Sequence, residues 1–445
     1  MLNLLSKYVF FPLWELKDGA HRGRYLAELM SSQWDSPEVL RDRQWAKLKR
    51  IVAYANDNCT YYRRRFAEMG FNGTFESWDD FRRLPQLSKQ DVRENVDGLI
   101  SRQFARGDLV EARTGGSTGT SLTIFADRSC QEMRNAAAMR SDRWAGWDIG
   151  MKVAAIWGNP PVADTLKKKL RNLLLDRFIY LDTMNIDDAS VRVFVERWRR
   201  ERPQVIFGHS HSLFILASLL QQMGVSDVRP RGIISTSMQL LEPERQVIER
   251  VFRCRATNRY GCEEVSLISC QCERHEGLHL NVDHVLVEFL REDGTQAEPG
   301  EEADIVVTEL INRGMPLIRY RVGDMGILGD HACSCGRGLP VMSRVTGRRA
   351  DFLKRRDGSL VAGVSLVERT LTAIPGIQQM QLVQDRIDTV EARVVKDERF
   401  DDAAARALAD ELQSVFGPGM SIRIILVDAL DQTRSGKYRF SICNV

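Results

Sequence analysis

Five short motifs carry side chains that suit the binding of phosphate, magnesium and hydroxyl groups. The first is a loop rich in glycine and hydroxyl side chains, made of Thr114, Gly115, Gly116, Ser117, Thr118, Gly119 and Thr120. Glycine lets the backbone N–H groups of such a loop turn toward an anion, and the hydroxyls add further donors. The loop lacks the Gly-Lys-Ser/Thr ending of a Walker P-loop. An ordinary surface hairpin is the alternative interpretation.

The second motif, Tyr260-Gly-Cys-Glu-Glu264, combines an aromatic ring with two carboxylates. Tyr260 is suited to stack on a flat base, and Gly261 beside it is counted with the nucleotide-binding residues. Glu264 is suited to hold Mg²⁺ between phosphate oxygens, because a hard cation prefers carboxylate ligands. The alternative is a tight turn with a solvated acidic pair.

The third and fourth motifs, Tyr320-Arg-Val-Gly-Asp324 and Gly347-Arg-Arg-Ala-Asp351, add a carboxylate and two arginines. The carboxylate of Asp324 can accept hydrogen bonds from both hydroxyls of a ribose diol. Arg321 and Arg348 match phosphate or carboxylate with a planar fork of donors. Ordinary salt bridges at the ends of strands are the alternative.

The fifth motif, Thr433-Arg-Ser-Gly-Lys-Tyr438, lies close to the last residue. A cation on a loop, such as Lys437, is suited to bridge a carboxylate substrate and an α-phosphate, where it would stabilise the charge of the transition state. Taken alone, a lysine near a chain end is ordinary surface decoration. The ordered set of five motifs instead indicates that distant residues meet on one nucleotide and that ATP activates a carboxylate.

Nine cysteines include two C-x-C pairs, Cys270/Cys272 and Cys333/Cys335. In a long chain without an evident export signal, such pairs indicate a metal more than disulfides, and we expect a cytoplasmic protein. Soft thiolates with one imidazole suit a closed, structural Zn²⁺ site. The expected ligands are Cys272, His279, Cys333 and Cys335. Cys270 and His275 are alternative ligands, and reduced buried thiols are the alternative to a metal.

The composition is that of a globular chain: 445 residues, 43% hydrophobic and 28% charged, with a net charge of +3. This balance gives no reason to expect a nucleic-acid partner, and no apolar run is long enough to span a bilayer. We expect the apolar stretch 2–16 to pack on the protein body, with a membrane surface as the alternative. For the basic runs 167–171 and 197–200 we expect solvated helix faces, with acidic headgroups or nucleotide phosphates as the alternative.

Hydrophobic periodicity predicts helices within 36–69 and over 129–144, 187–200, 213–223 and 242–252, alternating with strands at 153–157, 205–207 and 231–236. This alternation indicates an α/β fold with a mostly parallel sheet. Short alternating strands over 278–328, broken by Asp293-Gly294 and Pro299-Gly300, indicate a β-rich subdomain. Helices at 364–373 and 402–416, with strands at 377–383, 390–394 and 422–427, predict a small α+β lobe. We place the boundary near Asp351.

The ordered motifs resemble those of the adenylate-forming superfamily, and most closely its phenylacetate–CoA ligase branch with the CapK-like members. The segments Gln44-Trp-Ala-Lys-Leu48 and Asn58-Cys-Thr-Tyr-Tyr-Arg63 also resemble this branch. The resemblance implies a large N-terminal domain, residues 1–350, with a β-rich and zinc-containing subdomain at about 270–345. It also implies a mobile C-terminal domain, residues 351–445, that rotates between two reaction steps.

The implied reaction joins a carboxylate to ATP as an acyl-adenylate and then transfers the acyl group to a thiol such as CoA. The resemblance makes Lys437 the adenylation lysine, Glu264 the Mg²⁺ ligand, Asp324 the ribose ligand and Asp351 the hinge. It places Thr118 and its neighbours in the phosphate loop. The segment expected beside the acyl pocket contributes Gly208, His209 and Ser212. His209 and His211 are read as lining residues of a strand–helix turn and not as catalytic bases.

Two other functions stay open at this point. An adenylate-forming enzyme could pass the acyl group to an amine or hydroxyl, for instance on a sugar in capsular or exopolysaccharide biosynthesis. A nucleotide-binding scaffold without chemistry is the other, because Glu263 stands where the family has Thr or Ser and so adds a negative charge beside Glu264. The acid itself, and whether the chain forms a homodimer, are not readable from the sequence.

Overall fold

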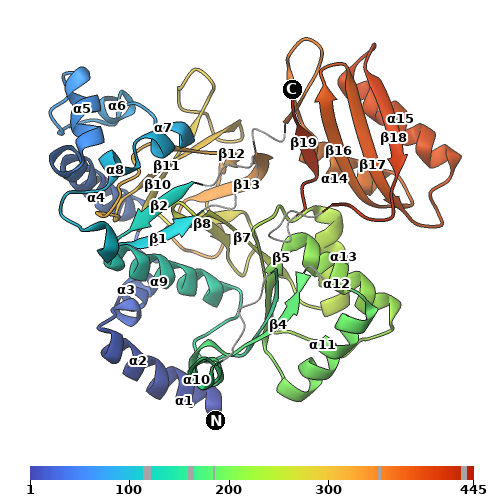
Figure 1. Cartoon of the computed structure of the whole chain (residues 1–445), viewed down its shortest axis with the longest axis horizontal. Helices are drawn as coiled ribbons and strands as arrows, with labels where there is room; N and C mark the ends of the chain where they lie inside the picture. Colours follow the sequence, from blue (N-terminus) through green and yellow to red (C-terminus); the bar gives the residue numbers. More distant parts are fainter. Residues whose placement is uncertain (114–121, 159–164, 184–185, 349–351, 432–437) are drawn as a thin grey trace.

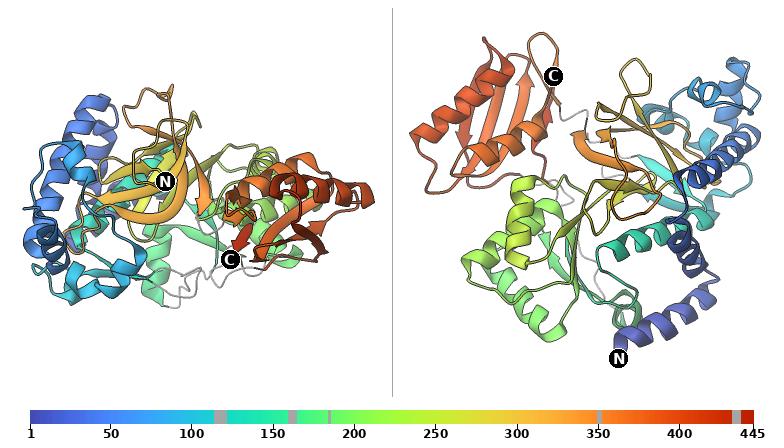
Figure 2. Two further views of the ribbon diagram at one scale, coloured as in Figure 1. Left: turned by 90° about the horizontal axis from the view of Figure 1, so that it is seen from above. Right: turned by 180° about the vertical axis from the view of Figure 1, so that it is seen from behind.

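The computed structural model (Figure 1) describes residues 1–113, 122–158, 165–183, 186–348, 352–431 and 438–445. A large body holds the N-terminal residues, and a smaller lobe holds the C-terminal ones; the lobe stands beside α12 and α13 in each view (Figure 1, Figure 2). Among the described residues, no helix has both the length and the apolar character that crossing a bilayer needs.

Helices form the first hundred residues of the chain. They are α1 (Leu2–Leu5), η1 (Ser6–Phe10, a π-helical turn), α2 (Phe11–Asp18), α3 (Arg22–Ser32), α4 (Pro37–Asn58), α5 (Thr60–Glu68), α6 (Trp78–Arg82), α7 (Lys89–Glu94), α8 (Val96–Leu99) and the short η2 (Arg106–Asp108). The helical prediction for 36–69 is confirmed, with a break at Cys59, whose backbone is extended. Ser36 caps α4 and Pro37 opens it, as is typical of helix starts.

A hairpin and a parallel half-sheet follow. The elements are β1 (Val110–Arg113), β2 (Thr123–Ala126), α9 (Arg128–Trp144), β3 (Val153–Trp157), α10 (Leu166–Arg171), η3 (Asn172–Asp176), β4 (Phe178–Asp182), α11 (Asp188–Glu201), β5 (Val205–His209), α12 (Ser210–Gln222), β6 (Gly232–Thr236), α13 (Glu242–Phe252) and β7 (Ala256–Cys262). The predicted alternation of strands and helices is confirmed. The order β7-β6-β5-β3-β4 is parallel throughout.

The parallel half has a switch point between β3 and β5. The chain leaves β3 for β4 on one side and then crosses back to β5 on the other, and from there it continues through β6 to β7. In open α/β sheets, ligands bind beyond the carboxyl ends of the strands at such a point. Residues just after β3 and β5 are therefore the first place to look for a small-molecule site.

The same sheet continues in an antiparallel half, so that eleven of the described strands form one sheet. The added strands are β8 (Ser266–Gln271), β9 (Leu278–Leu280), β10 (Val285–Leu290), β11 (Glu302–Glu309), β12 (Tyr320–Leu328) and β13 (Val341–Arg348). This half confirms the predicted β-rich region. It shares one apolar core with helices α4 and α5, whose Leu48, Val52 and Phe66 are fully or almost fully buried.

The C-terminal lobe has its own core and sheet. Its elements are β14 (Phe352–Lys354), β15 (Leu360–Ala362), α14 (Gly363–Ala373), β16 (Ile377–Arg386), β17 (Thr389–Lys396), α15 (Asp402–Phe416), β18 (Ser421–Leu426) and β19 (Ser441–Cys443). Strands β18-β17-β16-β19 form a four-stranded sheet, and α14 and α15 pack on it, which confirms the predicted α+β lobe. Two body residues, Met238 and Leu241, join the core of this lobe.

Candidate functional site

Two of the predicted nucleotide-binding residues contact each other directly. The hydroxyl of Tyr260, on β7, donates a hydrogen bond to Oδ2 of Asp324, on β12, over 2.8 Å. The register of β12 and β13 pairs Asp324 with Arg348, whose Nε lies 3.5 Å from Oδ1 of Asp324. Burial raises the pKa of Asp324 above its ordinary value, although Arg348 and the Tyr260 hydroxyl act against this shift.

The predicted magnesium ligand belongs to the same buried group. Oε1 of Glu264 accepts a hydrogen bond of 2.7 Å from the hydroxyl of Tyr320, which shares a face of β12 with Asp324. Burial and the nearby carboxylates raise the pKa of both Tyr260 and Tyr320, so both phenols remain neutral donors. Two carboxylates held side by side out of water are an arrangement that a cation would stabilise.

The turn between β7 and β8 is held tightly in place. A Cβ atom on Gly261 would lie 2.3 Å from the backbone oxygen of Ser266, so only glycine fits the close approach of the two strands. Nη2 of Arg134 donates a hydrogen bond of 2.7 Å to the backbone oxygen of Glu264. Arg134 is itself buried and makes a two-pronged ion pair with Glu309. This pair positions the turn, and sequence reasoning missed it because a lone arginine within a helix gives no signal.

Glu263 and Glu264 lie differently although they are adjacent. The side chain of Glu264 is buried and that of Glu263 is exposed. The extra negative charge that set this chain apart is therefore solvated and does not crowd the buried carboxylates. Lys89, on α7, is a further cation that acts on Asp324, and nothing in the sequence linked these two distant residues.

Arg321 lies elsewhere than the sequence reasoning expected. On β12 it alternates with Tyr320 and Val322, and its side chain is exposed on the other face of the strand from Asp324. Its Nη2 donates to Oδ2 of Asp304 over 2.8 Å. The structure therefore brings Arg348, and not Arg321, to the group around Asp324.

Three predicted parts fall outside the described residues: the loop Thr114–Thr120, the hinge Asp351 and the lysine Lys437. Their described neighbours give the following context. Strands β1 and β2, which lie on the two sides of the loop, pair as an antiparallel hairpin up to Arg113 and Thr123. Tyr438, which follows Lys437, packs edge-on against the imidazole of His211, with 4.2 Å between ring centroids.

The predicted acyl-pocket residues lie at the switch point of the sheet. Gly208 and His209 end β5, and Ser212 lies in the first turn of α12; all three are buried. The ring of His209 is 4.2 Å from that of Trp157, at the end of β3, and Trp157 stacks on Phe207 at 5.3 Å. Aromatic rings from the last residues of both strands therefore gather at the carboxyl ends of β3 and β5. Trp157 had no role in the sequence reasoning.

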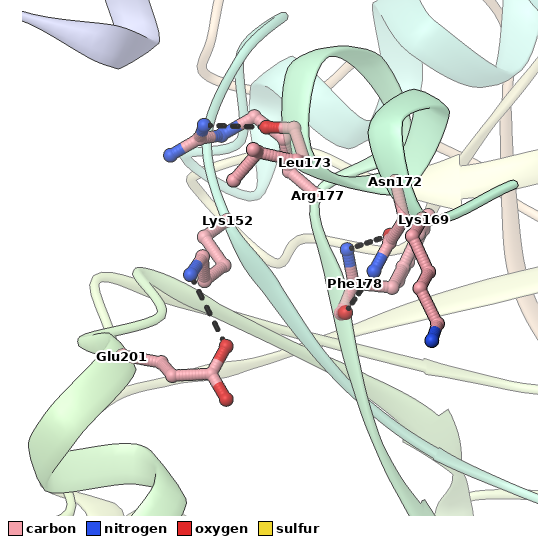
Figure 3. A pocket seen from close by; sticks show the side chains of 7 residues that line it. All are labelled: Lys152, Lys169, Asn172, Leu173, Arg177, Phe178 and Glu201. Carbon is pink, nitrogen blue, oxygen red and sulfur yellow. Dashed lines mark hydrogen bonds and ion pairs between the residues drawn. The ribbon is translucent and has the colours of Figure 1, made fainter. Parts of the chain in front are cut away.

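A surface cavity of about 240 Å³ lies away from these residues (Figure 3). Its lining residues are Lys152, Lys169, Asn172, Leu173, Arg177, Phe178 and Glu201. Lys152 forms an ion pair of 3.2 Å with Glu201 inside it. None of the predicted site residues that the structure describes lines this cavity.

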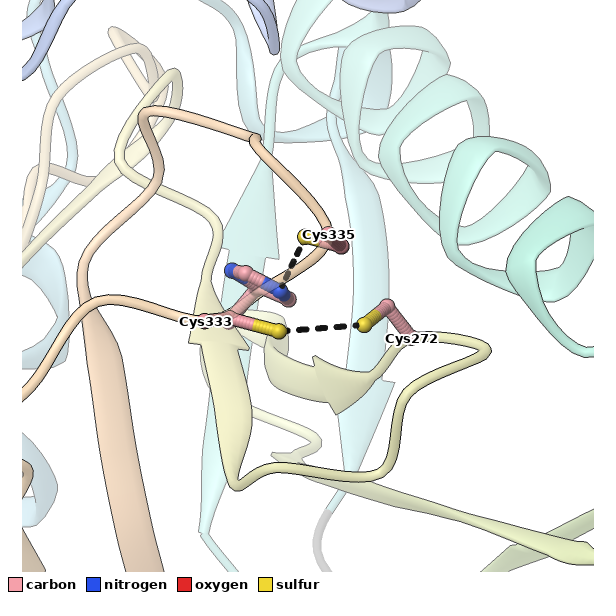
Figure 4. A group of neighbouring side chains, drawn as sticks. Cys272, Cys333 and Cys335 are labelled. Atoms are coloured by element: carbon pink, nitrogen blue, oxygen red, sulfur yellow. Dashed lines mark hydrogen bonds between the residues drawn. The ribbon is translucent and has the colours of Figure 1, made fainter.

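The four expected zinc ligands form one cluster, in which each residue offers a ligand atom within 4.8 Å of the others (Figure 4). Sγ of Cys272 lies 3.6 Å from Sγ of Cys333, and Sγ of Cys335 lies 3.3 Å from Nε2 of His279. All nine cysteines are described, and all are free thiols. The alternative ligands lie outside the cluster, because the Cys270 thiol contacts backbone oxygens instead and His275 is not a member.

The surroundings of the cluster suit a tetrahedral metal. Nδ1 of His279 lies 3.2 Å from the backbone oxygen of Leu339, which favours a proton on Nδ1 and leaves Nε2 free to face the sulfurs. Burial lowers the pKa of His279, which favours the neutral ring that a metal needs. Backbone N–H groups of Arg274 and Arg337 each point at a sulfur over 3.4 Å. The three thiols and one imidazole, with the backbone groups that contact them, therefore fit Zn²⁺.

Comparison with known proteins identifies the fold. Residues 353–444 match the family model of the CapK C-terminal domain. The chain is 23% identical over 419 residues to Protein CapK of Staphylococcus aureus, with 91% of this chain and 90% of that protein covered. It is 27% identical over 403 residues to the phenylacetate-coenzyme A ligase of Thermus thermophilus, with 84% and 86% covered. The resemblance to the phenylacetate–CoA ligase and CapK-like branch is confirmed.

The solved structures agree in fold and differ in how well they superpose. A 2-hydroxyisobutyryl-CoA ligase in the postadenylation state matches with a TM-score of 0.72 at 19% identity, over 90% of this chain and 88% of that one. The same ligase in the thioesterification state, with CoA, matches with a TM-score of 0.60 at 18% identity, over 92% and 90%. The chain therefore has the adenylate-forming ligase fold.

Proposed function

We propose that the chain is an ATP-dependent acid–CoA ligase. It would join a carboxylate to ATP as an acyl-adenylate with release of pyrophosphate, and then transfer the acyl group to the thiol of CoA with release of AMP. The observation that carries this proposal is the contact between Tyr260 and Asp324. These residues are 64 positions apart, yet they meet, with the half-exposed Arg348 paired to the same carboxylate and the buried Glu264 nearby, as convergence on a single nucleotide requires.

ATP and Mg²⁺ would supply the adenylyl group and the charge that balances its phosphates. For the nucleotide, Asp324 offers a carboxylate that the Tyr260 hydroxyl and Arg348 hold in orientation, which suits the hydroxyls of a ribose. Glu264 is oriented by Tyr320 and offers its remaining oxygen to a cation. Arg348 is half exposed, so its guanidinium can also reach an anion from solvent.

For the acid, we propose the switch point between β3 and β5. Gly208 lets the two strands lie close together, because a Cβ atom there would come within 2.9 Å of Ile156. Trp157, Phe207 and His209 give aromatic walls, which favour a compact or aromatic acid over a long acyl chain. Ser212 adds a hydroxyl at the start of α12, where backbone N–H groups favour a negative charge.

The smaller lobe would deliver the catalytic cation. Tyr438 touches His211 in the first turn of α12, so the residue after Lys437 lies beside the proposed acid site. The better superposition on the postadenylation state supports an arrangement in which the lobe closes over the first half-reaction. We propose 351–445 as the moving domain with its hinge at Asp351, 1–350 as the body, and 114–120 as the phosphate loop.

The Cys272, His279, Cys333 and Cys335 cluster is proposed to hold a structural Zn²⁺. It joins the turn after β8 to the turn between β12 and β13, and the latter strands carry Asp324 and Arg348. Four protein ligands leave no open position, so the metal would hold the subdomain in shape and take no part in the reaction.

The deciding experiment measures pyrophosphate release with ATP, Mg²⁺ and a panel of small and aromatic carboxylic acids. We expect release that depends on the acid and falls by about 100-fold or more in Lys437→Ala, because a preorganised charge at the reacting phosphate is lost. Lys396→Ala, an exposed lysine on the same lobe, is the matched control and should keep full activity. Absence of release with every acid would contradict the proposal.

The match to CapK favours a second candidate for the molecule that accepts the acyl group. The lobe that would take part in the transfer step matches a CapK family model, and CapK itself is among the relatives. An amine or hydroxyl acceptor, for example on a sugar of a surface polysaccharide, would share the first step and differ in the second. Mass spectrometry of reactions with CoA decides between them: an acyl-CoA product supports the ligase, and accumulated acyl-adenylate without thioester supports the other acceptor.

A further inference from the structure

Residues 2–18 form a helical rod, and several of its polar side chains contact the protein. This rod consists of α1, η1 and α2. Nδ2 of Asn3 donates to Oε1 of Gln204 over 2.6 Å, and Oγ of Ser6 donates to the backbone oxygen of Leu174 over 2.6 Å. Nζ of Lys7 donates to Oδ2 of Asp148 over 2.5 Å. The expectation that this stretch packs on the body is confirmed; it packs through these polar residues and through the half-buried Phe11 and Trp14, which contact the guanidinium groups of Arg22 and Arg171.

The opposite side of the rod faces solvent and is apolar. The side chains of Tyr8 and Leu16 are 66% and 80% exposed, and those of Leu4 and Leu13 about as much. A helix on a protein surface normally buries its apolar side and exposes its polar side. The reversed orientation leaves several large apolar residues in water, which marks a surface that another body covers.

A second short helix extends this surface. In α10 and η3, Leu166, Leu170 and Leu173 recur at steps of four and three, so they share one side, and all three are exposed. Besides the contact of Ser6 with Leu174, Nη2 of Arg177 donates to Oδ1 of Asn3 over 3.0 Å, so the two helical segments lie side by side. Figure 1 shows both at the end of the body remote from the C-terminal lobe.

The apolar residues are accompanied by positive charge. Lys167, Lys168 and Lys169 are exposed on α10 between the leucines. Two nearby carboxylates are paired within the protein, Asp176 with Arg171 at 3.0 Å and Asp148 with Lys7, and Asp18 at the end of α2 is exposed. The surface therefore presents leucines and a tyrosine together with the three exposed lysines of α10.

We propose that this end patch, defined by Leu4, Tyr8, Leu13, Leu16, Leu166, Leu170, Leu173 and Lys167–Lys169, binds the surface of an anionic phospholipid bilayer. The leucines would enter the boundary between headgroups and acyl chains, and the lysines would lie at the level of the lipid phosphates. A second copy of the chain is a poorer fit, because it would bring the same lysines against each other. The proposal does not depend on the reaction that the enzyme catalyses.

The geometry of the patch is compatible with a working enzyme. The C-terminal lobe and strand β12, which carries Asp324, lie away from α1, α2 and α10, so a bound membrane would not obstruct the proposed movement of the lobe (Figure 1). Attachment at this end would instead hold the enzyme beside an acid or an acceptor that resides in the lipid.

The test is sedimentation of the full-length chain with vesicles of phosphatidylcholine alone and of phosphatidylcholine mixed with phosphatidylglycerol. We expect binding to the anionic vesicles only, weakened as salt is raised well above about 0.1 M. Lys167→Gln/Lys168→Gln/Lys169→Gln should weaken binding by about 100-fold, at about fivefold per lysine. Leu166→Gln/Leu170→Gln/Leu173→Gln should weaken it by about tenfold or more.

The matched control for charge is Arg356→Gln/Lys396→Gln/Arg406→Gln, which removes three exposed cations from the C-terminal lobe and should bind as the parent protein does. Val193→Gln, exposed on α11, controls for the loss of an apolar residue. Thermal unfolding of each variant checks the fold, and the lysine variant changes only exposed side chains. Equal loss in the control variants, no binding by the parent, or self-association that the leucine variant abolishes without vesicle binding would each overturn the proposal.

Discussion

Tyr438 of the C-terminal lobe packs edge-on against the imidazole of His211 in the body, with 4.2 Å between the ring centroids. The imidazole in turn contacts the carboxylate of Glu244, so the aromatic contact rests on a buried, oriented partner. Phe440 packs on the same ring at 5.4 Å. The segment that follows Lys437 is thus anchored at the start of α12.

Removing this anchor should slow the first half-reaction. In Tyr438→Ala the lobe loses the closer of its two aromatic contacts with His211, and we expect acid-dependent pyrophosphate release to fall by about tenfold because Lys437 is less well positioned. Ile425→Ala, a change at an exposed position on β18, is the control and should have no effect. Equal rates for the two variants would show that the contact has no part in positioning.

The two arginines of the sequence motifs should differ in effect. Arg348→Gln removes the partner of Asp324, and we expect ATP affinity, measured by calorimetry, to fall by about tenfold. Arg321→Gln makes the same change on the other face of β12, where the partner is Asp304, and should leave the affinity unchanged. A larger loss in Arg321→Gln than in Arg348→Gln would contradict the placement of the nucleotide beside Asp324.

A rigid hinge should separate the two half-reactions. Asp351→Pro fixes the backbone φ angle at the proposed hinge. We expect pyrophosphate release in a single turnover to be within about threefold of the parent, and thioester formation to fall by about 100-fold, because the lobe cannot rotate. Asp357→Pro, in the turn after β14, is the control position within the same lobe. If Asp351→Pro slowed both steps equally, Asp351 would not be the hinge.

The cysteine cluster predicts bound metal. We expect about one zinc per chain by elemental analysis, and in Cys272→Ser far less zinc and a melting temperature lower by about 5 °C or more. Cys270→Ser, two residues away but outside the cluster, should keep its zinc. If the parent protein, purified in the absence of chelators, is folded but contains no zinc, the cluster is not a zinc site.

A buried histidine should make stability depend on pH. Burial lowers the pKa of His284 from 6.5 to about 3. The unfolded chain therefore takes up the proton first, and stability is lost as the pH falls below 6.5, by about 1.4 kcal/mol per unit. Between pH 6.5 and about 4.5, the unfolding free energy of the parent should fall by about 2–3 kcal/mol more than that of His284→Leu, in chemical denaturation. Parallel curves would show that His284 does not titrate this way.

Much of the architecture was predictable because its signals are local. The strand–helix alternation of the parallel half follows from periodicity, and so does the lobe built from β16, β17 and α15. The meeting of Tyr260 with Asp324 could be predicted only from the order of the motifs, since no local rule joins residues so distant. The sequence could have predicted that Arg321 and Asp324 lie on opposite sides of their strand, because residues three apart on a strand point to opposite sides.

Other features had no signal in the sequence. His211 and Tyr438 meet because two lobes dock, and Arg134 supports Glu264 because a helix happens to cross behind a turn. The sequence left Cys270 open as an alternative ligand to Cys272, and the structure separates them: Cys270 lies within β8, and Cys272 follows the end of this strand in the cluster. The composition of residues 2–16 shows that this segment is largely apolar. Which of its side chains are exposed to water depends on its contacts with distant residues such as Gln204 and Asp148.

Leu241 belongs to the body by sequence, yet it is fully buried among the core residues of the C-terminal lobe, with Met238 packed beside it. Any large rotation of the lobe would expose these two side chains to water, at a free-energy cost of about 2–4 kcal/mol. In the proposed rotation, this cost would favour the orientation described here over the rotated one. An acceptor would then have to bind the rotated form about 30-fold to 1,000-fold more tightly to populate it equally, so its arrival would trigger the proposed rotation.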